Sequence, residues 1–242
     1  MPRFHAPAAL LPGGWADDVL VEVDAGGTIL SVAASAAADG AERLHGPVLP
    51  GIPDLHSHAF QRAMAGLAER GGPAGDSFWS WRDLMYRFVD RLGPREVEAI
   101  AAQLHVELLR APSEQQELLR HGYTSVAEFH YVHNDRGGAS YEEETTLSDA
   151  ICAAAGASGI GLTLLPVAYR RGGFGGKPTS GAQARFVLGA DRYARLVETL
   201  SRRHRGDAQV RVGVAPHSLR AVDPADLAAT LAAIDAVDAT AP

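Results

Sequence analysis

The sequence has only one cysteine, Cys152, among 242 residues, and it has no long apolar run. One cysteine excludes an intrachain disulfide and a zinc site built from several thiolates. No stretch reaches the roughly 18 apolar residues of a membrane span, and the first residues do not resemble a secretory signal. The net charge of −7, without a long basic cluster, gives no reason to expect nucleic-acid binding. We therefore expect a cytoplasmic protein that binds neither nucleic acid nor membrane.

What the chain does contain, after residue 47, is an alternation of apolar strands with helices. The pattern predicts strands at 47–55, 123–129, 160–168 and 209–215, and helices at 93–111, 142–157, 190–204 and 223–237. Strands separated by helices favour βαβ units and a parallel sheet. Residues 1–47 instead read as short strands with turns, including a hairpin turn at 24–27. We therefore predict an α/β fold, in which four βα units would form half of an eight-stranded barrel.

Polar residues collect where the predicted strands end. They are His56 and His58 after the first strand, Glu128, His130 and Tyr131 after the second, Tyr169 and Arg170 after the third, and His217 and Arg220 after the fourth. In a (β/α) barrel the active site lies at the carboxyl ends of the strands. The repeated placement predicts a catalytic or binding face at that end.

His56 and His58 are separated by one residue, so in a strand their side chains lie on the same face. Two imidazoles placed this way could hold one metal ion, although a bare pair of loop histidines is the competing interpretation. A catalytic zinc usually has three protein ligands and lowers the pKa of its bound water toward about 7. His217 is the candidate third ligand, but with Arg220 three residues later it fits an anion receptor better.

Three other features have a structural interpretation that competes with function. His130 and His133 are more typical of loop histidines than of a metal site. Glu128 fits a satisfied buried carboxylate, or a hydrogen-bond partner behind a metal ligand. The aromatic segment 78–83 is interpreted as part of a long loop, where packing is the commoner role.

Four motifs, in order along the chain, resemble one family. The residues 49–62 read LPGIPDLHSHAFQR, residues 77–82 read SFWSWR, residues 127–133 read AEFHYVH, and residues 215–222 read APHSLRAV. Together they resemble the amidohydrolase superfamily and, within it, the formimidoylglutamate deiminases. The resemblance runs over nearly the whole chain.

The resemblance implies a partial TIM-type (β/α) barrel at 48–242, preceded at 1–47 by part of a small β-sandwich. It also implies zinc-dependent hydrolysis of N-formimino-L-glutamate to N-formyl-L-glutamate and ammonia, with one Zn2+ per subunit, in a homodimer. His56 and His58 match zinc ligands. The positions that match substrate-binding residues are Gln61, Arg82, Tyr131, His217 and Arg220. Arginines at two of these positions suit a substrate with two carboxylates.

Two departures from the family pattern bear on activity. Family members are longer, and the resemblance places their other zinc ligands and their catalytic histidine in later strands. We therefore expect no catalytic residue in this chain and an inactive fragment when it is purified alone. Residues 112–121 look like an insertion, and Pro112 should break a helix there, at a cost of roughly 3 kcal/mol. A deaminase for purines, pyrimidines or other amidines and a non-enzymatic truncated product remain the alternatives.

Overall fold

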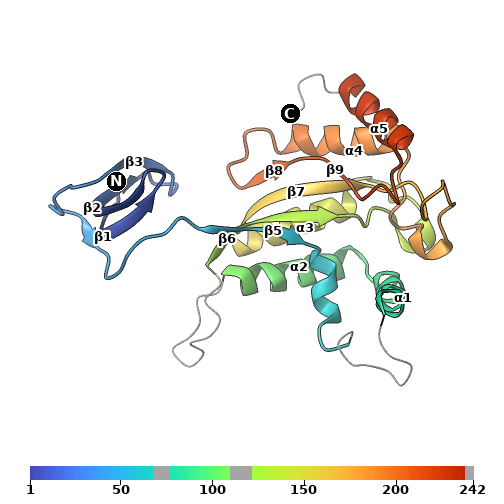
Figure 1. Ribbon diagram of the computed structural model, residues 1–242, viewed down its shortest axis with the longest axis horizontal. Coiled ribbons are helices and arrows are strands. Elements are labelled where there is room, and N and C mark those ends of the chain that lie inside the picture. The colour runs from blue at the N-terminus through green and yellow to red at the C-terminus, as the bar shows by residue number, and fades with distance from the viewer. Residues whose placement is uncertain (68–76, 110–121, 238–242) are drawn as a thin grey trace. The chain divides into compact units, whose positions relative to one another are not determined.

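The structure, a computed structural model, describes residues 1–67, 77–109 and 122–237. The chain divides into two compact units, Met1–Gly51 and Ile52–Pro242 (Figure 1). The insertion predicted at 112–121 lies outside the described residues. None of the helices in the described part is both long and apolar enough to cross a membrane.

The first unit is a four-stranded sheet. Its strands are β1 (Arg3–Leu11), β2 (Gly14–Val23), β3 (Ile29–Ala33) and β4 (Glu42–Arg43), in the order β3-β2-β1-β4. The hairpin predicted around residues 24–27 joins β2 to β3, which pair antiparallel. Asp24 closes that turn, because its Oδ1 accepts the backbone N–H groups of Gly26 at 2.9 Å and Thr28 at 2.8 Å. Such Asx turns favour Asp at this position, and glycine is favoured because it adopts positive φ, as Gly27 does at 85°.

The second unit is built on a parallel sheet. Its strands are β5 (Ile52–Ser57), β6 (Tyr123–His130), β7 (Gly161–Ala168) and β8 (Val210–Val212), in that spatial order, and the short β9 (Ala215–Pro216) pairs with the end of β7. All of these pairings are parallel. The predicted α/β fold is therefore confirmed, and the strands of the described part form an open sheet rather than a closed barrel.

In the described part of the chain, five α-helices belong to this second unit. They are α1 (Phe78–Val89), α2 (Pro94–Leu109), α3 (Thr146–Ser158), α4 (Ala190–Arg203) and α5 (Pro224–Val237). Figure 1 shows α2 below the strands and α4 and α5 above them. The predicted start of α5 is confirmed, since Asp223 Oδ1 accepts the N–H of Asp226 at 2.8 Å as an N-cap.

The prediction of a loop at 78–83 is wrong, because this segment is the start of α1. Ser77 caps the helix by accepting the N–H of Ser80 at 3.2 Å, and Ser80 accepts the N–H of Ser77 at 3.0 Å. The helix buries Met85, Tyr86 and Val89, all of them beyond the aromatic stretch. The helical periodicity is therefore visible only when the sequence is followed to residue 89.

The core lies between the sheet and its helices. Along β7 the buried positions alternate with partly exposed ones: Leu162 and Leu164 are buried, whereas Thr163 and Leu165 are half-buried. The buried set packs with apolar residues of α3 and α4, such as Ile151 and Leu196. One face of the sheet is thus sealed by helices, and the other face is left to line a pocket.

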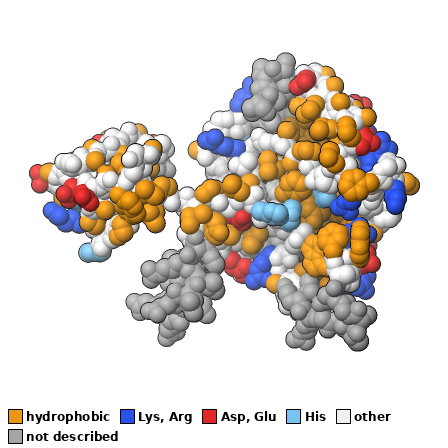
Figure 2. Space-filling view, viewed as in Figure 1, with side chains coloured by type: hydrophobic (Ala, Val, Ile, Leu, Met, Phe, Trp, Pro, Cys, Tyr) orange, Lys and Arg blue, Asp and Glu red, His pale blue; other side chains and the backbone are white. Residues whose placement is uncertain are grey.

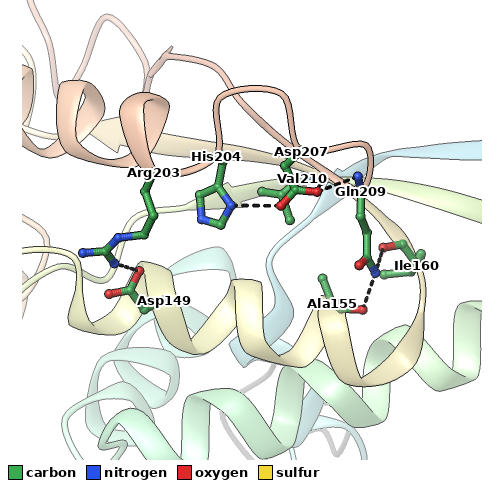
Figure 3. Close-up of polar contacts among 8 residues, drawn as sticks. All are labelled: Asp149, Ala155, Ile160, Arg203, His204, Asp207, Gln209 and Val210. Carbon is green, nitrogen blue, oxygen red and sulfur yellow. Dashed lines mark hydrogen bonds and ion pairs between the residues drawn. The ribbon is translucent and has the colours of Figure 1, made fainter.

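The end of α4 and the segment that leads from it to β8 carry polar groups that pair with one another and with α3 (Figure 3). This cluster is called here the α4–β8 junction (Asp149, Arg203, His204, Asp207, Gln209). Arg203 Nη1 lies 2.5 Å from Asp149 Oδ1, and His204 Nδ1 lies 3.3 Å from Asp207 Oδ2. Gln209 Nε2 donates to the carbonyls of Ala155 at 2.8 Å and Ile160 at 3.1 Å. These contacts fasten α4 and the start of β8 to α3.

Cys152 lies on α3, near this junction. Burial raises the pKa of its thiol to about 12, helped by the negative charge of Asp149. The thiol is therefore protonated, and unreactive, at neutral pH.

Candidate functional site

A pocket of about 570 Å³ lies at the carboxyl ends of the parallel strands. Every site residue predicted from the sequence lines it: His56, His58, Gln61, Arg82, Tyr131, His217 and Arg220. These side chains come from β5 and the residues after it, from α1, and from the segments that follow β6 and β9. Figure 2 shows histidine side chains at the surface of this unit with hydrophobic side chains around them and blue Lys or Arg side chains to one side.

His56 and His58 face the same space. Their ring centroids are 5.1 Å apart, with an angle of 78° between the ring planes. His58 Nδ1 lies 3.1 Å from the carbonyl oxygen of Phe129, so the other ring nitrogen, Nε2, remains available. Burial lowers the pKa of His58, and a neutral imidazole is the form that binds metal.

Glu128 holds the backbone that carries these two histidines. The Ser57 hydroxyl donates to Glu128 Oε2 at 2.5 Å, and the N–H of Ala59 donates to Oε1 at 2.8 Å. Because the donors flank His58, the carboxyl group fixes the turn on which the ring is placed. Burial raises the pKa of Glu128 to about 7. Its interpretation as a satisfied buried carboxyl group behind the candidate ligands agrees with these contacts.

The chemistry of these donors fits a zinc ion in part. Two imidazoles supply two of the three protein ligands that a catalytic zinc usually has. Among residues 1–67, 77–109 and 122–237, no group of three or more His, Cys, Asp or Glu side chains could hold a metal. A complete site therefore needs at least one ligand besides His56 and His58.

The prediction of loop histidines is wrong for His130, which ends β6, whereas His133 lies in the connection after that strand, as predicted. His130 is the last residue of β6, and both side chains are buried, with ring centroids 5.7 Å apart. His133 Nε2 lies 2.9 Å from the carbonyl of Val167. Burial lowers the pKa of His130 to about 3 and that of His133 to about 4, so both are neutral core residues. Neither lines the pocket.

Tyr131 and Gln61 form a hydrogen-bonded pair in the pocket. Gln61 Nε2 donates to the Tyr131 hydroxyl at 2.8 Å. Burial raises the pKa of Tyr131 well above its usual value, so its hydroxyl keeps its proton and remains a donor. The ring is held at an angle against Phe60, Phe186 and His217, at centroid distances of 5.1 to 5.8 Å.

The two pocket arginines carry charge that no carboxylate of the described residues pairs. The Arg82 guanidinium lies over the rings of Trp79, at 4.5 Å, and Tyr86, at 5.4 Å. Its buried Nε has no hydrogen-bond partner in the described part of the chain. Neither Arg82 nor Arg220 forms a salt bridge within that part.

His217 supplies a neutral ring beside Arg220. Burial, with the nearby Arg220 and His58, lowers the pKa of His217 to about 4. Its ring centroid is 4.7 Å from that of Tyr169. In the anion receptor expected from the sequence, the positive charge therefore comes from Arg220, while His217 offers a hydrogen bond.

The pocket also contains residues that sequence reasoning did not assign to it. Tyr86 and Met85 come from α1, and Phe186 comes from the segment between β7 and α4. Tyr169 had been noted only as a polar residue at a strand end. A continued helical pattern through residue 89 would have pointed to Met85 and Tyr86, whereas Phe186 is a single aromatic residue in a connection and carries no signal.

Comparisons with known proteins identify the family of the chain. Residues 48–241 match the model of the amidohydrolase family, and residues 1–46 match that of the "Formimidoylglutamate deiminase HutF, N-terminal domain". The chain belongs to the amidohydrolase family. It is 53% identical, over 233 residues, to the formimidoylglutamate deiminase of Pseudomonas aeruginosa, covering 96% of this chain and 49% of that protein. The chain thus spans about half the length of the curated relative it matches.

Solved structures extend the comparison to three dimensions. A crystal structure of an amidohydrolase from Brucella melitensis superposes with a TM-score of 0.84 at 45% identity, covering 95% of this chain and 49% of that one. A variant of atrazine chlorohydrolase from Arthrobacter aurescens, complexed with zinc and atraton, has a TM-score of 0.67 at 18% identity and covers 98% of this chain and 51% of that one. The second likeness shows the shared fold.

Proposed function

We propose that this pocket binds N-formimino-L-glutamate for zinc-dependent hydrolysis to N-formyl-L-glutamate and ammonia. The observation that carries the proposal is the presence of two arginines without carboxylate partners, among the described residues, in the pocket that His56 and His58 also line. The name of the relative from Pseudomonas aeruginosa supports the same substrate.

The charges of the pocket suit a dicarboxylate. A guanidinium binds a carboxylate through two parallel hydrogen bonds, and each charge-assisted bond is about twice as strong as a neutral one. Arg82 and Arg220 would each meet one carboxylate of the substrate. A neutral purine or pyrimidine would instead leave both cations unpaired, which disfavours such a substrate strongly.

The uncharged donors would orient the rest of the substrate. Tyr131 keeps its proton because burial raises its pKa, and Gln61 fixes the direction of its hydroxyl. His217 is neutral because burial lowers its pKa, so it can donate or accept one hydrogen bond without adding charge. Aromatic rings from Phe129, Tyr169 and Phe186 line the remaining wall and would pack against the apolar part of the substrate.

The metal would be held by His56 and His58 together with further ligands. When bound, a zinc ion supplies a Lewis acid and an activated water at neutral pH. The described residues hold two of the ligands that this needs, so we expect the 242-residue chain alone, with zinc, to release no ammonia from N-formimino-L-glutamate. Zinc-dependent ammonia release by the purified chain would contradict this part of the proposal.

Binding tests the substrate class separately from turnover. Trp79 and Trp81 lie beside Arg82, so their fluorescence should change when a ligand reaches it, and Trp15→Phe removes the background from the first unit. The Trp15→Phe chain is titrated with N-formyl-L-glutamate, with glutarate and with guanine. We expect saturable changes with both dicarboxylates and none with guanine. Saturation by guanine alone would favour a deaminase of neutral bases and would overturn the proposal.

A further inference from the structure

Arg185 is a fully buried cation with no assigned role. It lies between η3 (Gly181–Gln183) and α4, and only 1% of its surface is exposed. Taking a guanidinium out of water is costly unless its donors are satisfied. Here two of its three nitrogens meet backbone carbonyls: Nε donates to Asn134 at 2.9 Å, and Nη1 donates to Leu92 at 2.8 Å and also to Val89. The buried Nη2 has no hydrogen-bond partner among the described residues.

Two of these carbonyls lie at the end of α1 and just beyond it. Val89 is the last residue of the helix, and Leu92 follows it closely. The last carbonyls of a helix have no partner within it, and they carry the negative end of the helix dipole. The Val89 carbonyl also accepts the N–H of Leu92, so the buried guanidinium adds a second, charged donor and places a positive charge at the negative end of the helix dipole. An apolar side chain could supply neither.

The other side of Arg185 is fastened to the segment after β6. The N–H groups of His133 and Asn134 both donate to the Arg185 carbonyl at 2.9 Å. Asn134 Nδ2 in turn donates to the carbonyls of Ala184 at 3.0 Å and Val187 at 2.9 Å. Arg185 and Asn134 thus each donate a hydrogen bond to the other, and together they form a bonded pair behind the pocket.

The Arg185–Asn134 pair connects parts of the pocket that come from separate elements. Helix α1 carries Arg82, while the neighbour of Arg185, Phe186, lines the pocket against Tyr86 of α1 and Tyr131 after β6, at centroid distances of 5.8 Å and 5.1 Å. In α1 only Met85, Tyr86 and Val89 are buried. The helix is therefore held by one narrow face and by its carboxyl end, where Arg185 binds.

We propose that Arg185 is a positioning residue that fixes the end of α1 against the pocket and thereby sets the place of Arg82. The role of Arg82 toward a carboxylate rests on the proposed function, but the anchoring of α1 does not. Arg185 does not line the pocket, so any effect on binding has to pass through the residues that do.

The first measurement is hydrogen exchange, which needs no ligand. In Arg185→Met we expect the amides of 78–92 to exchange at least about tenfold faster, the loss expected when hydrogen bonds from a charged donor are removed. Amides of α3 should keep their rates. Arg185→Lys retains the charge but loses the planar guanidinium and its several N–H donors. The exchange rates of 78–92 in this variant should lie between those of the unchanged chain and those of Arg185→Met. The matched control is Arg203→Met, which removes an equal charge from the α4–β8 junction and should leave 78–92 unchanged.

The second measurement is a double-mutant cycle on the affinity for N-formyl-L-glutamate. Arg185→Met should raise Kd about tenfold when Arg82 is present and should have no further effect in an Arg82→Met chain, because coupled residues are not additive. Equal effects in both backgrounds, or unchanged exchange at 78–92, would overturn the positioning role. If the unmodified chain binds no dicarboxylate, the proposed function fails, and the exchange result alone decides whether Arg185 anchors α1.

Discussion

The pocket and the α4–β8 junction use the same kinds of side chain in opposite ways. At the junction, Arg203 meets Asp149 at 2.5 Å and His204 meets Asp207 at 3.3 Å (Figure 3). In the pocket, Arg82 and Arg220 have no such partner within the described residues. The charges of the first region are paired within the chain, whereas the second contains positive charge that no carboxylate of the described residues pairs.

The two regions lie at opposite ends of one sheet, and we expect one to serve binding and the other to serve stability. In (β/α) barrels, residues at the carboxyl ends of the strands carry the chemistry, while the opposite end contributes stability. The pocket lies at the carboxyl ends, and Gln209 of the junction binds next to the start of β7, at the carbonyl of Ile160. Changes in the two regions should therefore affect different measurements.

The largest effect should come from removing the charge of the pocket. Arg82→Met combined with Arg220→Met should weaken binding of N-formyl-L-glutamate by about 100-fold or more, since a hydrogen bond to a charged group contributes roughly 1.5–3 kcal/mol. Isothermal titration calorimetry measures the loss. Arg203→Met is the matched control, and its Kd should not change. If Arg203→Met weakened binding of N-formyl-L-glutamate as much, the affinity would not distinguish the pocket from the junction, and the comparison would fail.

The next effect concerns the backbone that carries the candidate zinc ligands. Glu128→Gln keeps the size of the side chain but loses one of the two acceptors that bind Ser57 and Ala59. Loss of such an outer contact typically weakens metal binding about 10- to 100-fold. Competition with a chromophoric chelator gives the zinc affinity. Glu144→Gln, at an ion pair with Arg192, is the control and should bind zinc as the unchanged chain does.

Acid should destabilise the chain through His130 and His133. Burial lowers their pKa values to about 3 and 4, so the folded protein keeps them neutral, whereas the unfolded chain protonates them near pH 6.5. Their contribution to stability is therefore complete above about pH 6.5 and is lost as the pH falls toward about 4 for His133 and about 3 for His130. Each proton lowers the free energy of unfolding by about 1.4 kcal/mol per pH unit in this window. Urea unfolding between pH 7 and 4.5 measures the slope, which should be smaller in His130→Gln.

The smallest effect is expected at the junction. Gln209→Ala removes two hydrogen bonds to main-chain carbonyls. We expect the free energy of unfolding to fall by about 1–2 kcal/mol, at roughly 1 kcal/mol per bond, with no change in dicarboxylate affinity. Urea unfolding measures the change in stability, and calorimetry measures the dicarboxylate affinity of the same variant. A change in affinity without a change in stability would assign a binding role to the junction.

The sequence predicted the elements wherever the apolar pattern is simple. The strands at 123–129 and 160–168 correspond to β6 and β7, and Asp223 caps α5 as expected. Helix α1 was missed because its first turns are aromatic and exposed, while the residues that bury it follow later. The first strand also begins later than predicted, at Ile52 rather than at residue 47.

The candidate site was predicted by motif rather than by physics alone. Strand alternation places His56 and His58 together, but it does not bring Arg82 of α1 to them. That meeting depends on the packing of α1, and hence on contacts such as those of Arg185, which lies 96 residues from Val89 in the chain. No local pattern encodes a contact of this kind, so Arg185 and Phe186 become visible only in three dimensions.

The thiol of Cys152 can be used to measure how often helix α3 opens. It is the single thiol of the sequence, it is half-buried, and its raised pKa slows its reaction with alkylating reagents while α3 stays folded. Iodoacetamide will label it mainly in molecules where that helix has opened, so the rate of labelling reports how often the helix layer comes apart. The parent chain and any variant can be compared in this way without a dye or an added tag.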